Sequence, residues 1–115
     1  MNRFVHVGFY FVSHVKTREL EPVFTAIGED WIRYSPLCWI LWTSKPTPHI
    51  FTLLASHLSL GDNVLIGAIA EDMFGYLTPW IWDWIQSKRP DILRGQDAWN
   101  KLNLPASQLQ TKPIF

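Results

Sequence analysis

The segment at residues 4–12 reads FVHVGFYFV and decides how this chain of 115 residues folds. Its length and its aromatic and β-branched residues predict a strand. Alternate side chains of a strand point to opposite faces, and both the odd-numbered and the even-numbered residues here include large apolar groups. The sheet built on this strand therefore either has cover on both faces or exposes an apolar patch on one of them.

Length and composition predict one folded domain. Hydrophobic residues make up 48% of the chain, which includes seven Trp, and this differs from the polar composition of disordered proteins. Ten basic residues balance ten acidic ones, so no global field attracts polyanions. Cys38 is the single cysteine, which excludes an intramolecular disulfide and predicts a reducing, cytoplasmic location. No apolar run approaches the roughly 18 residues of a membrane span, so no membrane association is expected.

A helix and a hairpin are expected next. Apolar residues at helical spacing predict a helix that begins at Thr17 or Arg18, has Pro22 in its first turn and stops at Gly28. The following segment, WIRYSPLCWILWTS, predicts two strands at residues 31–34 and 38–43 around a turn.

A second helix and a fourth strand complete the expected sheet. Thr47 is expected to cap the helix, Pro48 to begin it, and His57 to lie on its inward face as a core residue. Residues 63–70 read NVLIGAIA, and because they carry no charge we expect this strand in the middle of the sheet.

The C-terminal part is expected to form a third helix and an arm. Thr78 caps this helix, Pro79 begins it and Pro90 ends it. We therefore predict a domain at residues 1–89, followed by an extended arm at residues 90–115 that packs on the sheet or on a partner.

The order strand, helix, strand, strand, helix, strand predicts an α+β fold of ferredoxin-like type, a split βαββαβ antiparallel sheet with a C-terminal helix and an extended arm. In that fold both crossover helices cover one face of the sheet. The other face of a solitary domain alternates toward polar residues, but three of the strands here do not. We expect a second copy of the sheet, the C-terminal segments, or both to cover it.

Residues 4–88 also carry a pattern of apolar, aromatic and glycine positions. After the apolar first strand, the matching positions are Gly28, Trp31, Tyr34, Trp39, Ile40, Leu41, Thr43, Leu60, Asp62, Val64, Leu65, Ile66, Gly75, Leu77, Trp82, Asp83, Trp84 and Ile85. With them the chain resembles small bacterial proteins of the SinR family, which are similar in turn to CRISPR-associated ferredoxin-like nuclease subunits and to virulence-associated D-type toxins. The resemblance implies a dimeric ferredoxin-like fold and, among the more distant relatives, metal-dependent cleavage of nucleic acid.

The chain departs from those nucleases at the end of the first strand. The relatives carry an Asp there, whereas this chain has Phe9, Tyr10 and Phe11. A magnesium site needs hard oxygen ligands, which aromatic rings do not offer. We therefore expect no catalytic residue, no metal ligand and no cofactor.

Other polar residues have structural interpretations. His6 is expected to be a packed or interface histidine, because it lies on a strand between apolar neighbours. Cys38 and His49 are the two soft ligands expected nearest each other, but no zinc-type spacing accompanies them. Asp62 is expected to be a solvated turn charge, as are Glu71 and Asp72.

Two functions remain open from the sequence, with a third possibility beside them. The leading hypothesis is a non-catalytic homodimer that serves as an interaction or regulatory module. Its interface residues are predicted to be Val7, Phe9, Phe11, Trp39, Trp42 and Trp99. The alternative is a nucleic-acid-binding protein or degenerate nuclease, with Arg3, Arg33 and Lys45 as its cations. The third is a small-molecule pocket lined by Tyr76, Trp80 and Trp84.

Overall fold

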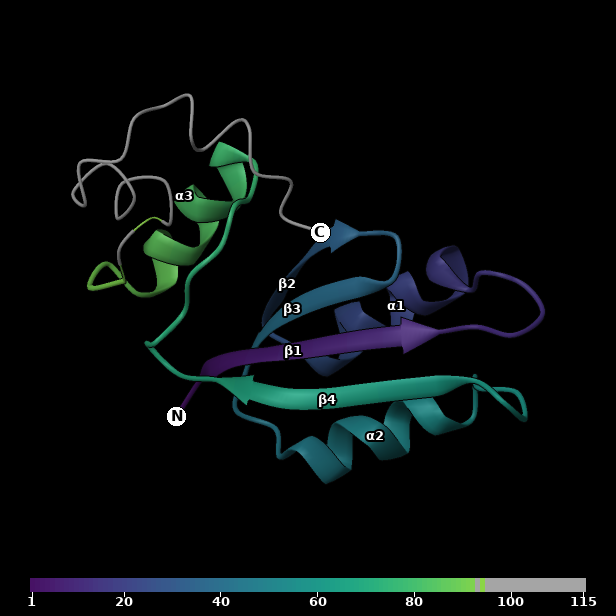
Figure 1. Cartoon of the computed structure of the whole chain (residues 1–115). Helices are drawn as coiled ribbons and strands as arrows, with labels where there is room; N and C mark the ends of the chain where they lie inside the picture. Colours follow the sequence, from purple (N-terminus) through teal and green to yellow (C-terminus); the bar gives the residue numbers. More distant parts are fainter. Residues whose placement is uncertain (93, 95–115) are drawn as a thin grey trace. The chain divides into compact units, whose positions relative to one another are not determined.

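The computed structural model describes residues 1–92 and 94, and the chain divides into two compact units, Met1–Ala70 and Glu71–Phe115. The first unit contains a four-stranded antiparallel sheet and two helices, and the described part of the second contains one helix (Figure 1). The α+β class expected from the sequence is confirmed. The predicted boundary between a domain at residues 1–89 and an arm stays a prediction.

The first unit alternates strands and helices in the expected order. Its elements are β1 (Arg3–Tyr10), α1 (Thr17–Ile27), β2 (Asp30–Ser35), β3 (Cys38–Thr43), α2 (Thr47–Ala55) and β4 (Asn63–Ile69). The strands lie in the order β2-β3-β1-β4, and every neighbouring pair is antiparallel. The helix α1 therefore connects two strands that have β3 between them, and α2 connects two strands that have β1 between them.

The prediction that residues 63–70 form a central strand is wrong. β4 lies at one edge of the sheet and, within the described residues, pairs with β1 alone. An absence of charge indicates an apolar environment on the faces of a strand, but it does not say how many strands are its neighbours. Here α2 returns the chain to the outer side of β1, so β1 and β3 take the two central places.

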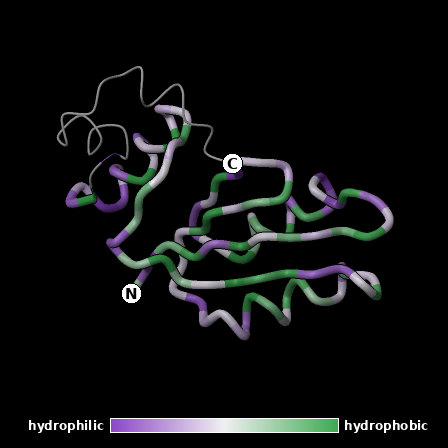
Figure 2. The backbone as a smooth tube through the Cα atoms, in the orientation of Figure 1, coloured by the Kyte–Doolittle hydropathy of each residue, from purple (hydrophilic) through white to green (hydrophobic). Residues whose placement is uncertain are grey.

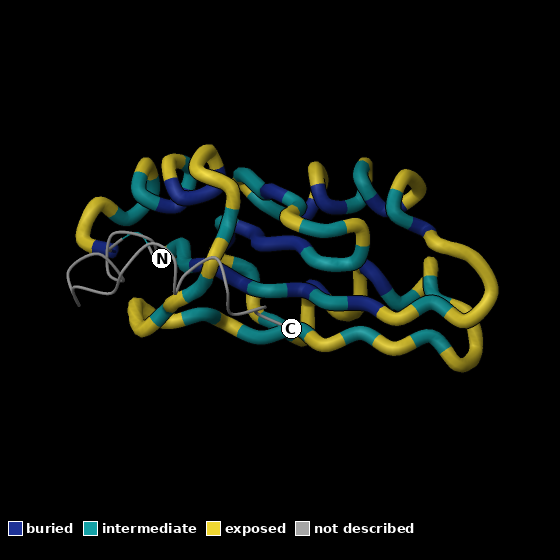
Figure 3. The backbone as a smooth tube through the Cα atoms, turned by 45° about the horizontal axis from the view of Figure 1, so that its top comes forward, coloured by how far each residue is buried: buried dark blue, intermediate teal, exposed yellow. Residues whose placement is uncertain are grey.

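The core of the first unit lies between the sheet and its two helices. The odd-numbered residues Val5, Val7 and Phe9 of β1 face α1 and α2, both of which lie on the same side of the sheet (Figure 1). Phe24 of α1 stacks on Trp39 of β3, with ring centroids 4.6 Å apart. Buried residues are concentrated in this layer, whereas β4 has none (Figure 3).

The second face of the sheet is the one turned away from α1 and α2, and the burial of its residues differs from one end of the sheet to the other. Register places the even-numbered residues of β1 here, together with alternate residues of the other strands. Phe4, Ile32 and Ile40 are buried, while Tyr10 and Leu65 are exposed. The expectation that both faces of the first strand carry apolar residues is confirmed.

Three details of the helices differ from the sequence-based expectations. Thr47 does not cap α2 but is its first residue, and Pro46 occupies the N-cap position. Pro22 lies inside α1 and not in its first turn, because the helix begins at Thr17. Pro22 is exposed on the outer side of the helix. His57 is exposed and lies beyond the end of α2 at Ala55, so it is not a core residue. Gly61 adopts a φ of 91°, a left-handed conformation suited to glycine, and turns the chain toward β4.

The described part of the second unit is organised around α3 (Pro79–Lys88). Its start at Pro79 agrees with the expectation, and Ile81, Trp82 and Ile85 are buried. The amide of Gln86 donates to the carbonyl of Ile92, 3.0 Å away, which holds the chain after the helix. No helix among residues 1–92 is long and apolar enough to cross a membrane.

Candidate functional site

A buried ion pair between Lys16 and Asp62 positions the N-terminal end of the edge strand β4. The ammonium of Lys16 donates to Asp62 Oδ2 at 2.8 Å, to Ser59 Oγ at 2.6 Å and to the His57 carbonyl at 3.1 Å. An ammonium has three N–H donors, and all three are used here. The side chains of Lys16 and Asp62 are 4% and 0% exposed.

The carboxylate of Asp62 joins three segments of the chain. It also accepts backbone N–H groups from Ser59 at 2.8 Å and from Val12 at 2.9 Å. These hydrogen bonds, with that of Lys16 the largest cause, lower the pKa of Asp62 to about 2. The prediction that Asp62 is a solvated turn charge is therefore wrong. The pair fixes the end of β1, the start of α1 and the entry to β4 against one another.

The outer edge of β4 is apolar and carries no charged side chain. Its sequence NVLIGAI is hydrophobic over most of its length (Figure 2). Leu65 is 75% exposed on the second face of the sheet, and the strand contains no buried residue. Soluble proteins usually protect an edge strand with Lys, Pro or a bulge, and β4 has none of these.

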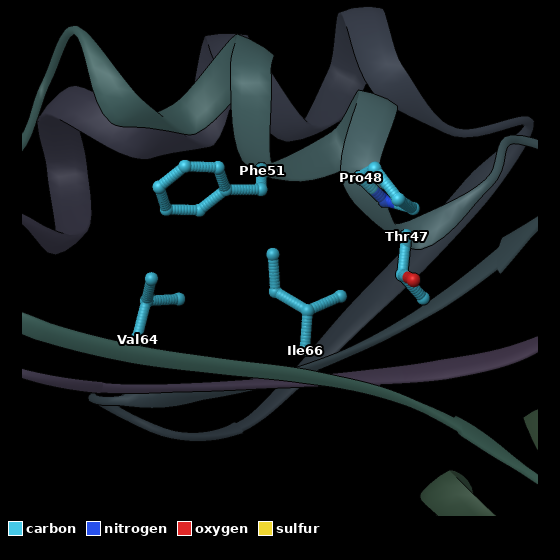
Figure 4. A pocket seen from close by; sticks show the side chains of 5 residues that line it. All are labelled: Thr47, Pro48, Phe51, Val64 and Ile66. Atoms are coloured by element: carbon cyan, nitrogen blue, oxygen red, sulfur yellow. The ribbon is translucent and has the colours of Figure 1, made fainter.

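An open apolar groove runs beside this edge on the helix face. It has a volume of about 240 Å³, and Thr47, Pro48 and Phe51 of α2 line one side. Val64 and Ile66 of β4 line the other, with their side chains pointing toward Phe51 (Figure 4). Phe51 is 48% exposed. The groove and the strand edge together form the candidate site, which we call the β4 edge.

A second group of polar side chains lies on the opposite face of the sheet. His6 Nε2 of β1 and Tyr34 Oη of β2 share a hydrogen bond of 2.6 Å that spans β3. The Cys38 thiol on β3 contributes to the electrostatic environment of Tyr34. Alternation along β2 places Tyr34 on the same face as Ile32, and the register of β2 with β3 shifts between Arg33 and Ser35.

The environment of this group favours its neutral forms. Burial lowers the pKa of His6, because the imidazolium loses hydration. Burial, with a smaller contribution from the Cys38 thiol, raises the pKa of Tyr34 to about 12. At neutral pH the site therefore presents a neutral imidazole and a protonated phenol.

The described residues among the predicted interface set do not form one exposed surface. Val7, Phe9 and Trp39 are buried in the core, where the chain's own helices cover them. Phe11 is partly buried against that core, and Trp42 lies on the second face with its ring 4.8 Å from that of Phe4. Trp99 lies outside the described residues. The residues of the β4 edge were not among those predicted, because the strand was expected in the middle of the sheet.

Two of the predicted nucleic-acid cations, Arg3 and Lys45, are in contact, and the third, Arg33, lies on β2. The guanidinium of Arg3 donates to the carbonyls of Thr43 and Lys45, at 2.9 and 2.7 Å. Arg33 donates to Glu21 at 2.6 Å and lies over the ring of Trp39. Register places Arg3 and Arg33 on the helix face, and both guanidinium groups have partners within the fold. The nucleic-acid alternative stays a prediction.

The expected soft ligands and turn carboxylates are also separated. His49 is exposed on α2, on the other side of the sheet from Cys38. The histidine near Cys38 is instead His6. Among residues 1–92 and 94, no three His, Cys, Asp or Glu side chains gather as a metal-binding group. Glu71 and Asp72 are exposed, in agreement with a solvated position.

The predicted small-molecule pocket has no support in the described part of the second unit. Tyr76 and Trp80 are exposed, while the ring of Trp84 lies 5.8 Å from the Lys88 ammonium. The groove described above lies in the first unit and is lined by none of these aromatic residues.

Comparison with known proteins gives no relative for this chain: no family model, no curated protein and no solved structure matches it.

Proposed function

We propose that the chain is a non-catalytic homodimeric interaction module of ferredoxin-like fold, in which the β4 edges of two copies pair. The strand order β2-β3-β1-β4 and the two interleaved crossovers support this fold assignment. The observation that carries the proposed function is an edge strand that has seven residues, no charge and an apolar groove beside it. Unpaired N–H and C=O groups on such an edge are a template for another strand.

A two-fold axis through the centre of β4 would let the same edge of two copies pair. Ile66 is the middle residue of Asn63–Ile69, so an antiparallel pair centred there uses the whole strand. Val64 would then face Ala68 of the second copy, and Leu65 would face Gly67. No charged residue lies opposite another, because the nearest charge, on Asp62, is already paired with Lys16. Such pairing would join two sheets into one of eight strands.

The groove adds apolar burial to the backbone hydrogen bonds of this pairing. Ile66 and Val64 line the groove on the helix face, and Phe51 overhangs it from α2. In the joined sheet these side chains would be covered by the same side chains of the second copy. Burial of apolar surface contributes roughly 25 cal/mol per Å², so this seam, and not the hydrogen bonds alone, would supply most of the association free energy.

The test is the oligomeric state of the whole chain and of an edge variant. Analytical ultracentrifugation at micromolar concentration should give about twice the 13.4 kDa mass of the chain. Ile66→Lys should shift the equilibrium toward monomer by more than about tenfold, because two ammonium groups would face each other in the seam. Far-UV circular dichroism and thermal unfolding establish that the variant folds.

A matched control is available in the turn that precedes the strand. Leu60 is fully exposed and lies outside β4, so Leu60→Lys adds the same charge without entering the seam. The control should self-associate like the original chain. A folded, monodisperse monomer of the unsubstituted chain, or equal loss of association in both variants, would contradict pairing through β4.

A further inference from the structure

The two edges of the sheet differ in what they offer to another strand. In the strand order β2-β3-β1-β4, β2 lies at the rim opposite β4. The pairing of two β4 edges would therefore leave a β2 strand at each rim of the joined sheet. The backbone and side chains of β2 then decide if a further copy can add to that sheet.

A backbone donor on the outer side of β2 is already occupied. The carbonyl of Trp42 accepts the N–H of Glu29 at 3.1 Å, so Trp42 turns its backbone groups toward β2. Asp30 lies opposite Trp42, and alternate residues of a strand bond to opposite sides, so Trp31 turns its backbone groups out of the sheet. The N–H of Trp31 donates to Asp30 Oδ1 at 2.8 Å. A strand that approached β2 would find this donor in use.

The side chains of β2 on the helix face are held by α1. Arg33 Nη1 donates to Glu21 Oε1 at 2.6 Å, and Trp31 Nε1 donates to Thr25 Oγ1 at 3.2 Å. The register of β2 with β3 also shifts between Arg33 and Ser35, and an irregular edge is a poor template for another strand. The β2 edge is therefore charged and irregular, whereas β4 is uncharged.

We propose that β2 is a protected edge, on which Asp30 and Arg33 prevent the addition of a third copy, so that assembly through β4 stops at two chains. This inference rests on the proposed function. A strand that paired with β2 would have to displace the Asp30 carboxylate from the Trp31 N–H and remove two charged side chains from water. The uncharged β4 imposes neither cost. The charged residues of β2 thus determine the number of copies in the assembly.

The test removes the protection of β2 in the whole chain. Asp30→Ala frees the Trp31 N–H, and Arg33→Val removes the other charge of the strand while keeping a residue suited to strands. In analytical ultracentrifugation, the double variant should form species of about four chains or more as its concentration rises, whereas the unsubstituted chain should stop at two. Each single substitution should shift the mass in the same direction by a smaller amount.

A matched control removes the same charges elsewhere. Arg18 and Glu19 are exposed on α1, so Arg18→Val with Glu19→Ala also takes away one charge of each sign. This control should stop at two chains. Far-UV circular dichroism and thermal unfolding establish that each variant folds. A folded double variant that stops at two chains, or growth of the unsubstituted chain beyond two, would overturn the protected edge.

A further variant separates strand pairing from unspecific aggregation. Ile66→Lys added to the double variant blocks β4, so its assembly should again stop at two chains, now joined through β2. Growth of this triple variant beyond two chains would contradict pairing by strand edges.

Failure of β4 pairing gives a different result. The unsubstituted chain would then be a monomer, which contradicts the proposed function, while the double variant should still form two-chain species through β2. A folded double variant that also remained a monomer would overturn the protected edge as well.

Discussion

Replacement of Phe24 tests the central packing of the first unit most directly. Phe24 is fully buried, its ring stacks on Trp39 at an interplanar angle of 16°, and its edge meets Phe9 with centroids 6.2 Å apart. Phe24→Ala removes all three contributions of the ring: its apolar burial, its dispersion contacts and its aromatic geometry.

The expected magnitude follows from this environment. A Phe→Ala change in a packed core costs about 3–5 kcal/mol, since the apolar transfer free energy is lost and a cavity remains. Phe24→Leu retains most of the volume and should cost roughly 1–2 kcal/mol, much of it from the lost aromatic pairs. Because small domains have about 5–15 kcal/mol of stability in total, Phe24→Ala should bring the chain close to unfolding at room temperature.

Urea unfolding followed by tryptophan fluorescence measures these differences, because Trp39 is in contact with the substituted position. The order of stability should be the original chain, then Phe24→Leu, then Phe24→Ala, with similar denaturant slopes. Phe74→Ala is the control: this phenylalanine is 55% exposed and lies in the second unit, so its loss should cost much less. A cost below about 1 kcal/mol for Phe24→Ala would refute the packing argument.

Three further predictions concern pH and helix geometry. The pKa of Asp62 is lowered to about 2, so its contribution to stability is present above its ordinary pKa of 3.8 and is lost as pH falls toward 2. Asp62→Asn should reduce stability at neutral pH and make the thermal unfolding temperature depend less on pH in the acid range. The pKa of Tyr34 is raised to about 12, so its contribution to stability is complete below pH 10.0 and is lost as pH rises through 12. Tyr34→Phe should make the thermal unfolding temperature depend less on pH in the alkaline range. An unchanged pH dependence would contradict the environment described for Tyr34. Pro22 interrupts the hydrogen bonds of α1 while exposed, so Pro22→Ala should stabilise the chain by about 1–2 kcal/mol in urea unfolding, and a loss of stability would show that the proline is needed there.

The sequence predicted well those elements whose signals lie within a few neighbouring residues. The strand at residues 38–43 and the start of α3 at Pro79 were predicted at their observed bounds, because alternation of apolar residues and a proline at the first helical position act within a few residues. The predicted core position of His57 failed because helical spacing continued past Ala55, where the helix ends.

The two candidate sites depend on contacts between residues that are far apart in the sequence. Lys16 and Asp62 are 46 residues apart, and no spacing rule connects them. His6 and Tyr34 are 28 residues apart and meet across the intervening strand β3, on the face that alternation along β1 and β2 assigns to both. The sequence predicted Asp62 to be a solvated turn residue, because its hydrogen-bond partners come from other segments of the chain and are not visible near it in the sequence.

The sequence by itself determined that this chain forms an α+β sheet with apolar residues on both faces, because the two-residue period of a strand assigns each side chain to a face. Tertiary structure alone decided which strand lies at the edge. The uncharged strand Asn63–Ile69 is predicted equally well at the centre or at the rim, since face burial and strand neighbours are separate properties. Its place beside β1, fixed by the crossover through α2 and by the Lys16–Asp62 pair, makes it the surface on which the proposed association depends.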